Sequence, residues 1–457
     1  MDGRTWAAVL VKGLIFKLLV EQGIDIAEYA SKSQVKRSSR REPLAFMYFG
    51  LLLFLFVYFL RPQDWVPGLA SVPLAKITGF LMLVALVFSF SNVRWRVPKE
   101  IIFLCLLVIQ LWLTIPFSPV WRGGAYELTL YFTKVLPVVV VMYGTVRSMK
   151  RLRGILFVQA ASVAVVAIAS VVVARVSSGR LRGVLSGIYG NSNDLALIID
   201  LSLPICLAFL LTARSNWKKI AWSVVMLAMI YAVFLTASRS GAITLIVVAL
   251  ICLWQIGVKN RLFSLLLLIP VAAIVIWAYG GNSLRQRFEQ TNMDPAGANR
   301  STEAFDSAQQ RKQLLIQSLK ITAEHPLFGV GPGNFPVVSG VWRVTHNSYT
   351  QISSEGGIPA LILYLLIFWR GIVNVRDIRR YPKADKRVQL FSMALGASLA
   401  AYLVGSIFAS VAYQLFPYCL IAYTSALRFI AQRDRTASSL VPTIQPPPVE
   451  AQSTVWQ

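Results

Sequence analysis

Twelve apolar runs along the chain constrain its fold more than any other feature. Each is long enough to cross the ~30 Å hydrocarbon layer of a bilayer as an α-helix. The runs lie at 44–60, 72–90, 100–117, 127–145, 154–174, 194–212, 218–236, 240–257, 262–279, 348–369, 389–409 and 412–430. The sequence therefore predicts an all-α, polytopic integral membrane protein with about twelve transmembrane helices.

The composition agrees with lipid as the solvent. Only 14% of the residues are charged, whereas a soluble protein has about 25%. All the cysteines lie inside apolar runs, which excludes a disulfide framework and a CxxC metal site; they are Cys105, Cys206, Cys252 and Cys419. No DxD pair is present for a divalent ion. We therefore expect neither a metal nor a cofactor.

The net charge of +25 could favour binding of nucleic acid, of anionic lipid or of an anionic substrate. The positions of the charges decide among these partners. With the N-terminus in the cytoplasm, Lys and Arg collect in the inside connections, as the positive-inside rule requires. These include Arg94, Arg96, Lys99, Arg147, Lys150, Arg151, Arg153, Arg214, Lys218, Lys219, Lys259, Arg261, Arg370, Arg376, Arg379, Arg380, Lys383, Lys386 and Arg387. We expect membrane lipids and no nucleic acid as partners.

This topology divides the chain into five segments. They are a cytoplasmic segment at 1–43, nine helices at 44–279, a large periplasmic loop at 280–347, three helices at 348–432, and a disordered cytoplasmic tail at 433–457. Residues 6–20 are apolar but short and interrupted by Lys12 and Lys17, so we expect an interfacial helix there.

The large loop holds both histidines, His325 and His346. Within it, 307–324 is expected to form a helix that ends before Pro326. Leu315, Leu319 and Thr322 recur on one face of this helix, and Arg311 lies one turn before Leu315. Arg311 should therefore face the protein or the membrane surface.

Several arginines lie on the predicted outer side, against the topogenic trend. Arg175, Arg180, Arg182 and Arg239 occupy short outer connections, and Arg311 and Arg343 lie in the large loop. A guanidinium group can bind two phosphate oxygens at once, and it stays charged at any working pH. The alternatives are contacts with lipid headgroups or capping of helix carbonyls. Convergence of several arginines on one side favours an anion site.

His346 is a candidate general base toward a sugar hydroxyl, because it begins a predicted helix beside these arginines. Neighbouring cations should lower its pKa and keep it neutral. The alternative is a polar helix-terminal residue at the membrane interface. Glu355 lies about 180° around the helix from His346. Unless Gly356 and Gly357 kink the helix, Glu355 should contact a neighbouring helix instead.

Two charges fall inside spans, Lys134 and Asp200. Ionisable groups at that depth are costly and usually face a cavity or each other. A structural ion pair or a neutral Asp200 is favoured over contact with a substrate.

Several of these residues resemble a motif set of the O-antigen ligase and polymerase superfamily of bacterial membrane glycosyltransferases. The matching pieces are His346-Asn347-x-Tyr349 with Glu355-x-Gly357; Ser238-Arg239-Ser-Gly241; Arg311 with His325-Pro326-Leu327-Phe328-Gly329-Val330-Gly331-Pro332-Gly333-Asn334-Phe335; and Arg182-Gly183 with Asn191-Ser192-Asn193. Ser192 replaces the usual proline, and Ala360 replaces a usual glycine. The pieces occur in the family's order and on the predicted outer side.

The resemblance implies transfer of a glycan from an undecaprenyl-diphosphate carrier on the periplasmic side of the bacterial inner membrane, without metal. By this resemblance, Arg239 and Arg311 bind the diphosphate, Arg182 or Arg180 helps, and His346 takes a proton from the acceptor hydroxyl.

The resemblance leaves the acceptor open. It is a lipid A–core sugar in a ligase, another carrier-linked repeat in a polymerase, or a protein hydroxyl in an oligosaccharyltransferase, with the ligase favoured. A polysaccharide transporter, with Lys134 and Asp200 lining a path, and a non-catalytic scaffold are the other classes. No inverted repeat supports the transporter.

Overall fold

The structure of this chain is a computed structural model. It describes residues 44–64, 66, 68–92, 97–173, 176–177, 180–181, 183, 185, 187–256, 303–380 and 385–439. These residues are helical apart from loops and one antiparallel pair of two-residue strands, β1 (Val176–Ser177) and β2 (Arg180–Leu181). The expected interfacial helix at 6–20, the span at 262–279 and the start of the large loop lie outside the described residues.

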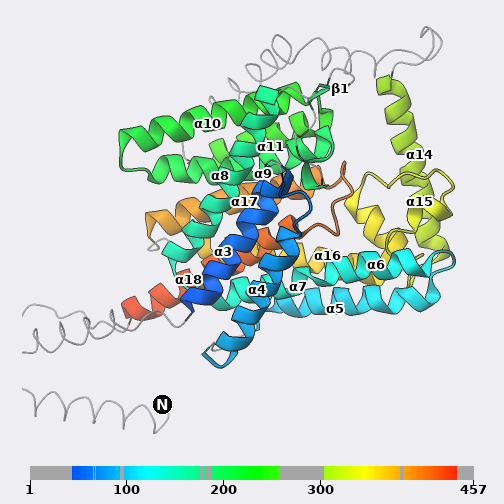
Figure 1. Cartoon of the computed structure of the whole chain (residues 1–457), viewed down its shortest axis with the longest axis horizontal. Helices are drawn as coiled ribbons and strands as arrows, with labels where there is room; N and C mark the ends of the chain where they lie inside the picture. The colour runs from blue at the N-terminus through cyan, green and yellow to red at the C-terminus, as the bar shows by residue number, and fades with distance from the viewer. Residues whose placement is uncertain are drawn as a thin grey trace, which may run out of the picture.

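The helices follow the apolar runs closely (Figure 1). In chain order they are α3 (Ala45–Leu60), η1 (Pro62–Asp64), α4 (Leu74–Ser89), η2 (Phe90–Asn92), α5 (Lys99–Thr114), η3 (Ile115–Phe117), α6 (Arg122–Thr133), α7 (Val135–Thr145), α8 (Met149–Val173), η4 (Gly187–Tyr189), α9 (Ser192–Thr212), α10 (Asn216–Leu235), α11 (Arg239–Ile256), α14 (Glu303–Glu324), α15 (Phe335–Val338), α16 (Ser348–Arg379), α17 (Lys386–Gly405) and α18 (Leu415–Ser439). The last helix thus extends beyond the expected start of the tail.

The described part of the chain contains eight helical segments long and apolar enough to cross a membrane. They comprise α3 with η1, α5 with η3, α6 with α7, α8, α9, α10, α16 and α17. Helices α4 and α11 are apolar but shorter. The prediction of an all-α, multi-pass membrane protein is confirmed, whereas the count of twelve is not.

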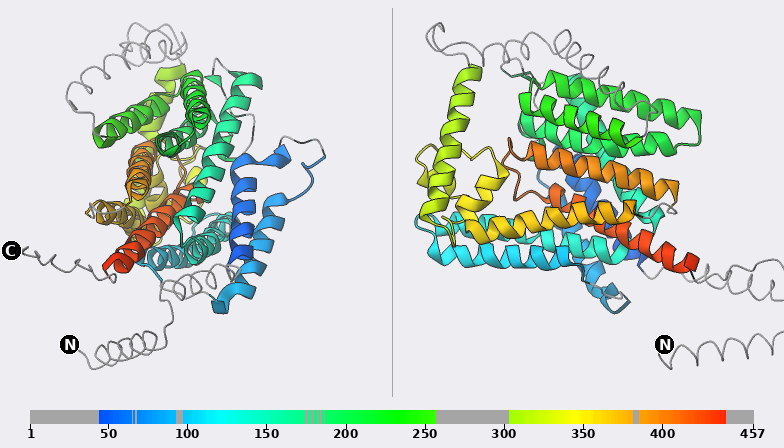
Figure 2. Two further views of the ribbon diagram at one scale, coloured as in Figure 1. Left: turned by 90° about the vertical axis from the view of Figure 1, so that its left-hand side faces the viewer. Right: turned by 180° about the vertical axis from the view of Figure 1, so that it is seen from behind.

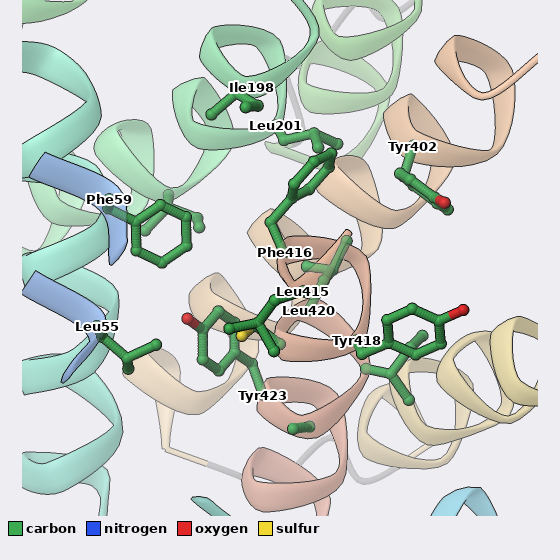
Figure 3. Close-up of a cluster of buried hydrophobic side chains, with 14 of the residues drawn as sticks. Leu55, Phe59, Ile198, Leu201, Tyr402, Leu415, Phe416, Tyr418, Leu420 and Tyr423 are labelled. Atoms are coloured by element: carbon green, nitrogen blue, oxygen red, sulfur yellow. The ribbon is translucent and has the colours of Figure 1, made fainter. Parts of the chain in front are cut away.

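Helix α9 forms the centre of the bundle and packs against α8, α10, α11 and α17. Helix α16 packs against α5, α17 and α18. Bulky apolar and tyrosine side chains from separate helices fill the core (Figure 3). They include Leu55 and Phe59 of α3, Ile198 and Leu201 of α9, Tyr402 of α17, and Phe416, Tyr418 and Tyr423 of α18. These contacts fix the positions of the helix ends that carry the site.

Helix α14 lies across one end of the bundle, roughly perpendicular to the spans (Figures 1 and 2). Arg239 starts α11 at this end, which we call the Arg239 end. The inner face of α14 buries Leu314 and Ile321 against Val330 and Phe335. On the face predicted to meet the protein or the membrane surface, Leu315 and Leu319 are not covered by protein in the described structure.

Lys134 and Asp200 do not pair. Lys134 is exposed at the break between α6 and α7, whereas Asp200 is fully buried in α9. Neither oxygen of the Asp200 carboxyl has a hydrogen-bond partner among the described residues. The alternative of an ion pair is therefore wrong. A neutral Asp200 remains, because a buried carboxylate without a partner would be costly.

Candidate active site

His346 stands directly before the N-terminus of α16. The Asn347 side chain caps this helix by accepting hydrogen bonds from the N–H groups of Tyr349 (2.9 Å) and Thr350 (3.2 Å). His346 itself has a left-handed backbone, with φ of 54°, which is costly for a non-glycine residue and is often found at functional sites. The helix begins at Ser348, where the apolar run was predicted to start, so His346 precedes the helix instead of beginning it.

The connection between α17 and α18 holds this helix start in place. Ser348 Oγ donates a hydrogen bond to the carbonyl of Ala409 (2.6 Å), and the hydroxyls of Thr345 and Ser410 lie 3.0 Å apart. At the second residue of the helix, Tyr349 Oη donates to the carbonyl of Leu403 in α17 (2.8 Å). The residues on both sides of His346 are therefore anchored to the bundle. Tyr349 ties the start of α16 to α17.

His346 is half-buried and electrostatically coupled to two arginines. Burial, and then the charges of Arg311 and Arg343, lower the pKa of His346 to about 4. The imidazole is therefore neutral at neutral pH, as predicted for a base. Burial has the larger effect, whereas the sequence pointed only to the cations.

Arg239 is placed by a tight turn between α10 and α11. Ala237 in this turn has a left-handed backbone, with φ of 46°. Ser238 Oγ accepts a hydrogen bond from the Gly241 N–H (3.1 Å) and so caps α11. A Cβ on Gly241 would lie 2.6 Å from the Ala196 side chain. The Ser-Arg-Ser-Gly segment therefore combines a helix cap with close packing of α11 on α9.

The N-termini of α9 and α11 lie side by side at the Arg239 end. Asn191 caps α9 by accepting from the N–H groups of Asn193 and Asp194, both at 2.9 Å. Asn193 Oδ1 in turn accepts from Ser238 Oγ at 2.8 Å. Helix N-termini carry partial positive charge and favour anions. The asparagines of the Asn-Ser-Asn segment thus join two such termini.

Arg311 in α14 meets Arg239 across the helix ends. Its side chain is half-buried, and burial followed by the charge of Arg239 lowers the pKa of Arg311. Within the described residues, Arg311 forms no hydrogen bond or ion pair. The charge of Arg239 thus acts on Arg311, and the charges of Arg311 and Arg343 act on His346. We call these four residues the cation cluster.

Arg343 is the member of the cluster to which the sequence assigned no role. Its guanidinium donates a hydrogen bond to Gln310 in α14, and its charge acts on His346. The family-like pieces do not include Arg343, but its position on the predicted outer side, among the other arginines, indicated it.

Arg180 and Arg182 are not placed at this site. The backbone of Arg180 lies in β2, but its side chain lies outside the described structure, as does Arg182 altogether. Their binding of an anion stays a prediction.

Helix α16 is broken at Gly357, which has φ of 81°. The N–H of Ile358 donates to the carbonyl of Pro326 (2.7 Å) instead of to Ser354 within the helix. Pro359 has no N–H for the carbonyl of Glu355. The break therefore frees two carbonyl groups inside the protein, where unpaired groups are costly.

The Gly-Val-Gly segment satisfies both carbonyls. Val330 N–H donates to Ser354, and Gly331 N–H donates to Glu355, each at 2.9 Å. A Cβ on Gly329 would approach the Glu355 backbone to about 2.5 Å. Two family-like pieces far apart in sequence are therefore halves of one interface.

The Glu355 side chain is buried away from His346. Together with burial, the Glu355 carboxyl raises the pKa of Tyr413, which lies between α17 and α18. The Glu355 carboxyl also interacts with the backbone of Gly333 and Phe335. Glu355 and Gly357 thus shape the fold under the site.

Residues 224–365 match the family model described as O-antigen ligase. The matched region contains Arg239, Arg311 and His346, together with the broken part of α16. No curated protein matches the chain. The resemblance to the O-antigen ligase superfamily is confirmed. At the general level, the match supports a multi-pass membrane enzyme of the glycosyltransferase and ligase type, with glycan and lipid-linked substrates.

Proposed function

We propose that this protein transfers a glycan from an undecaprenyl-diphosphate carrier to an acceptor hydroxyl at the periplasmic face of the bacterial inner membrane. The cation cluster is the observation that carries the proposal. Arg311 and Arg239 repel one another beside two helix N-termini, and the charge of Arg311 acts in turn on the neutral imidazole of His346. An anion with more than one negative charge would relieve this repulsion, and a lipid-linked diphosphate has that charge.

In this proposal, Arg239 and Arg311 hold the diphosphate, and Arg343 adds a third positive charge. Guanidinium groups match phosphate oxygens geometrically. The carbon–oxygen bond between the sugar and the diphosphate breaks, and the diphosphate leaves with the electron pair. Fixed cations stabilise this developing charge without rearranging during the reaction. Arg180 and Arg182 are proposed to assist from the connection before α9.

His346 receives the proton of the acceptor hydroxyl while the acceptor oxygen bonds to the anomeric carbon. An imidazole with a pKa near 4 is a weak base. A bound diphosphate would partly neutralise Arg311 and Arg343, which depress the pKa of His346. Donor binding would therefore raise the basicity of His346 when it is needed.

The accumulated intermediate in a deletion strain tests the proposal. Full-length glycan left on the carrier indicates a ligase, and single repeats on the carrier indicate a polymerase. A full-length carrier-linked glycan together with unglycosylated secreted proteins indicates an oligosaccharyltransferase. Unchanged carrier-linked pools, with the chain normally expressed in the parent strain, would contradict the proposal.

A further inference from the structure

Helix α14 has an exposed apolar stripe beside the cation cluster. The exposed fractions are 38% for Leu315, 57% for Ile316 and 53% for Leu319. On a helical projection the stripe lies between Arg311 on one side and the exposed Lys320 on the other. The exposed Lys312 falls on the same face, one turn before Leu315 and Ile316, at the N-terminal end of the stripe. Helix α14 is therefore apolar on two faces, of which one packs on protein and the other has no cover in the described structure.

The stripe lies next to membrane-spanning surface. The Thr322 and Ser353 hydroxyls are 2.9 Å apart, so the end of α14 lies beside α16 about 8 Å below the start of that helix. Thr322 and Leu319 lie on neighbouring parts of the α14 circumference. The stripe therefore flanks the contact between α14 and a span.

The segment after α14 continues the apolar surface onto α5. Leu327 is 62% exposed, and the adjoining Phe328 ring stacks on Phe117 at 4.1 Å. Gln110 donates to the Leu327 carbonyl at 2.8 Å, four residues before the end of α5. This irregular segment thus lies about 6 Å below the end of a span, beside the exposed Leu113.

We propose that Leu315, Ile316, Leu319 and Leu327 form a ledge that is embedded in one leaflet of the bilayer, in contact with lipid acyl chains. Three observations identify lipid as the occupant: α14 lies across the ends of the spans (Figure 2), the apolar surface is continuous with a span, and the polar side of α14 faces away. Amphipathic helices in this arrangement lie at the membrane interface.

The ledge leads to the cation cluster, because Arg311 is one turn before Leu315 on the same side of α14. A lipid lying along the ledge would present its phosphate to Arg311. The membrane contact itself does not depend on the proposed transfer.

Spin labels on adjacent positions of α14 test the ledge. We would replace the four native cysteines by alanine, introduce Leu319→Cys or Lys320→Cys, and reconstitute the full chain in phosphatidylethanolamine–phosphatidylglycerol vesicles. The label at 319 should be more accessible to oxygen than to a water-soluble nickel chelate, and the matched label at 320 should show the reverse order. A Leu327→Cys label provides a second position that should behave like 319.

Equal nickel accessibility at 319 and 320 would place the stripe in water and overturn the proposal. Low accessibility to both reagents at 319 and 327 would show a protein cover, from a partner or a second copy, and would overturn it equally. Neither measurement requires catalysis, so a failed ledge is distinguishable from a failed transferase assignment.

Discussion

Arg239 and Arg311 are the side chains whose removal tests the cation cluster most directly. We expect Arg239→Ala and Arg311→Ala each to lower the transfer rate at least about 100-fold, because each removes a fixed positive charge from the leaving diphosphate. The measurement is glycan transfer in membranes with matched amounts of protein. Lys320→Ala is the control, since Lys320 lies on the exposed side of α14 and its ion-pair partner among the described residues is Glu324. Wild-type rates in both arginine variants would exclude diphosphate binding by these residues.

The acid limb of the pH profile should depend on Arg343. Arg343 lowers the pKa of His346, so Arg343→Gln should raise this pKa toward the ordinary value of about 6.5. The base must be neutral, which requires a pH above its pKa. As the pH is lowered, kcat/KM, which reports ionisations of the free enzyme, should therefore begin to fall at a higher pH in Arg343→Gln than in the wild type.

Arg343→Lys retains the positive charge and serves as the matched variant, with an acid limb near that of the wild type. An acid limb that does not move in Arg343→Gln would show that His346 does not accept the proton in the transition state.

The sequence indicated which residues meet, but not how the backbone holds them. Asn347 is a helix-cap residue by type, and His346 was foreseen beside arginines. The left-handed conformation of His346 depends on hydrogen bonds from Thr345 and Ser348 to the connection between α17 and α18. Such distant partners leave no local signal in a single sequence.

At the scale of elements, the break in helix α16 depends on Gly357, where any other residue would strain the backbone. Gly357→Ala would place a side chain in the left-handed region and against the Leu327 carbonyl. We expect a loss of stability of about 1–3 kcal/mol from the backbone strain alone. Thermal unfolding in detergent would measure it as a lower Tm.

Gly79→Ala is the matched control, because Gly79 is helical and its nearest neighbour would be an ordinary 3.5 Å away. The control should unfold at the wild-type temperature or above it, since alanine favours helix. If Gly357→Ala unfolded at the same Tm as Gly79→Ala, the interface between α16 and the Gly-Val-Gly segment would contribute no stability.

Apolar runs predicted most helices to within a few residues, because each helix in lipid must satisfy its own backbone. The breaks were harder to predict. The helix is interrupted between α6 and α7 at Lys134, and α16 is broken at Gly357. In α16 the compensating N–H groups come from Val330 and Gly331, which precede it in the chain. Periodicity within the helix carries no information about donors outside it.

At the scale of the whole molecule, the function depends on which side of the membrane holds the cation cluster. The positive-inside pattern predicts that α14 faces the periplasm and that the far end of α16 faces the cytoplasm. The two ends of α16, Ser348 and Arg379, are separated by the full 32-residue length of the helix. Side chains at the two ends must therefore be reached from opposite sides of the membrane.

Cysteine labelling of intact spheroplasts should resolve this orientation. In a cysteine-free chain, Gln313→Cys on the exposed face of α14 should react with a membrane-impermeant maleimide, and Arg379→Cys should react only after lysis. The pair is matched in exposure, so a difference reports sidedness and not burial. The reverse pattern would place Arg239, Arg311 and His346 in the cytosol, where a donor presented in the periplasm cannot reach them. The periplasmic transferase would then be excluded, although the geometry of the cation cluster would be unchanged.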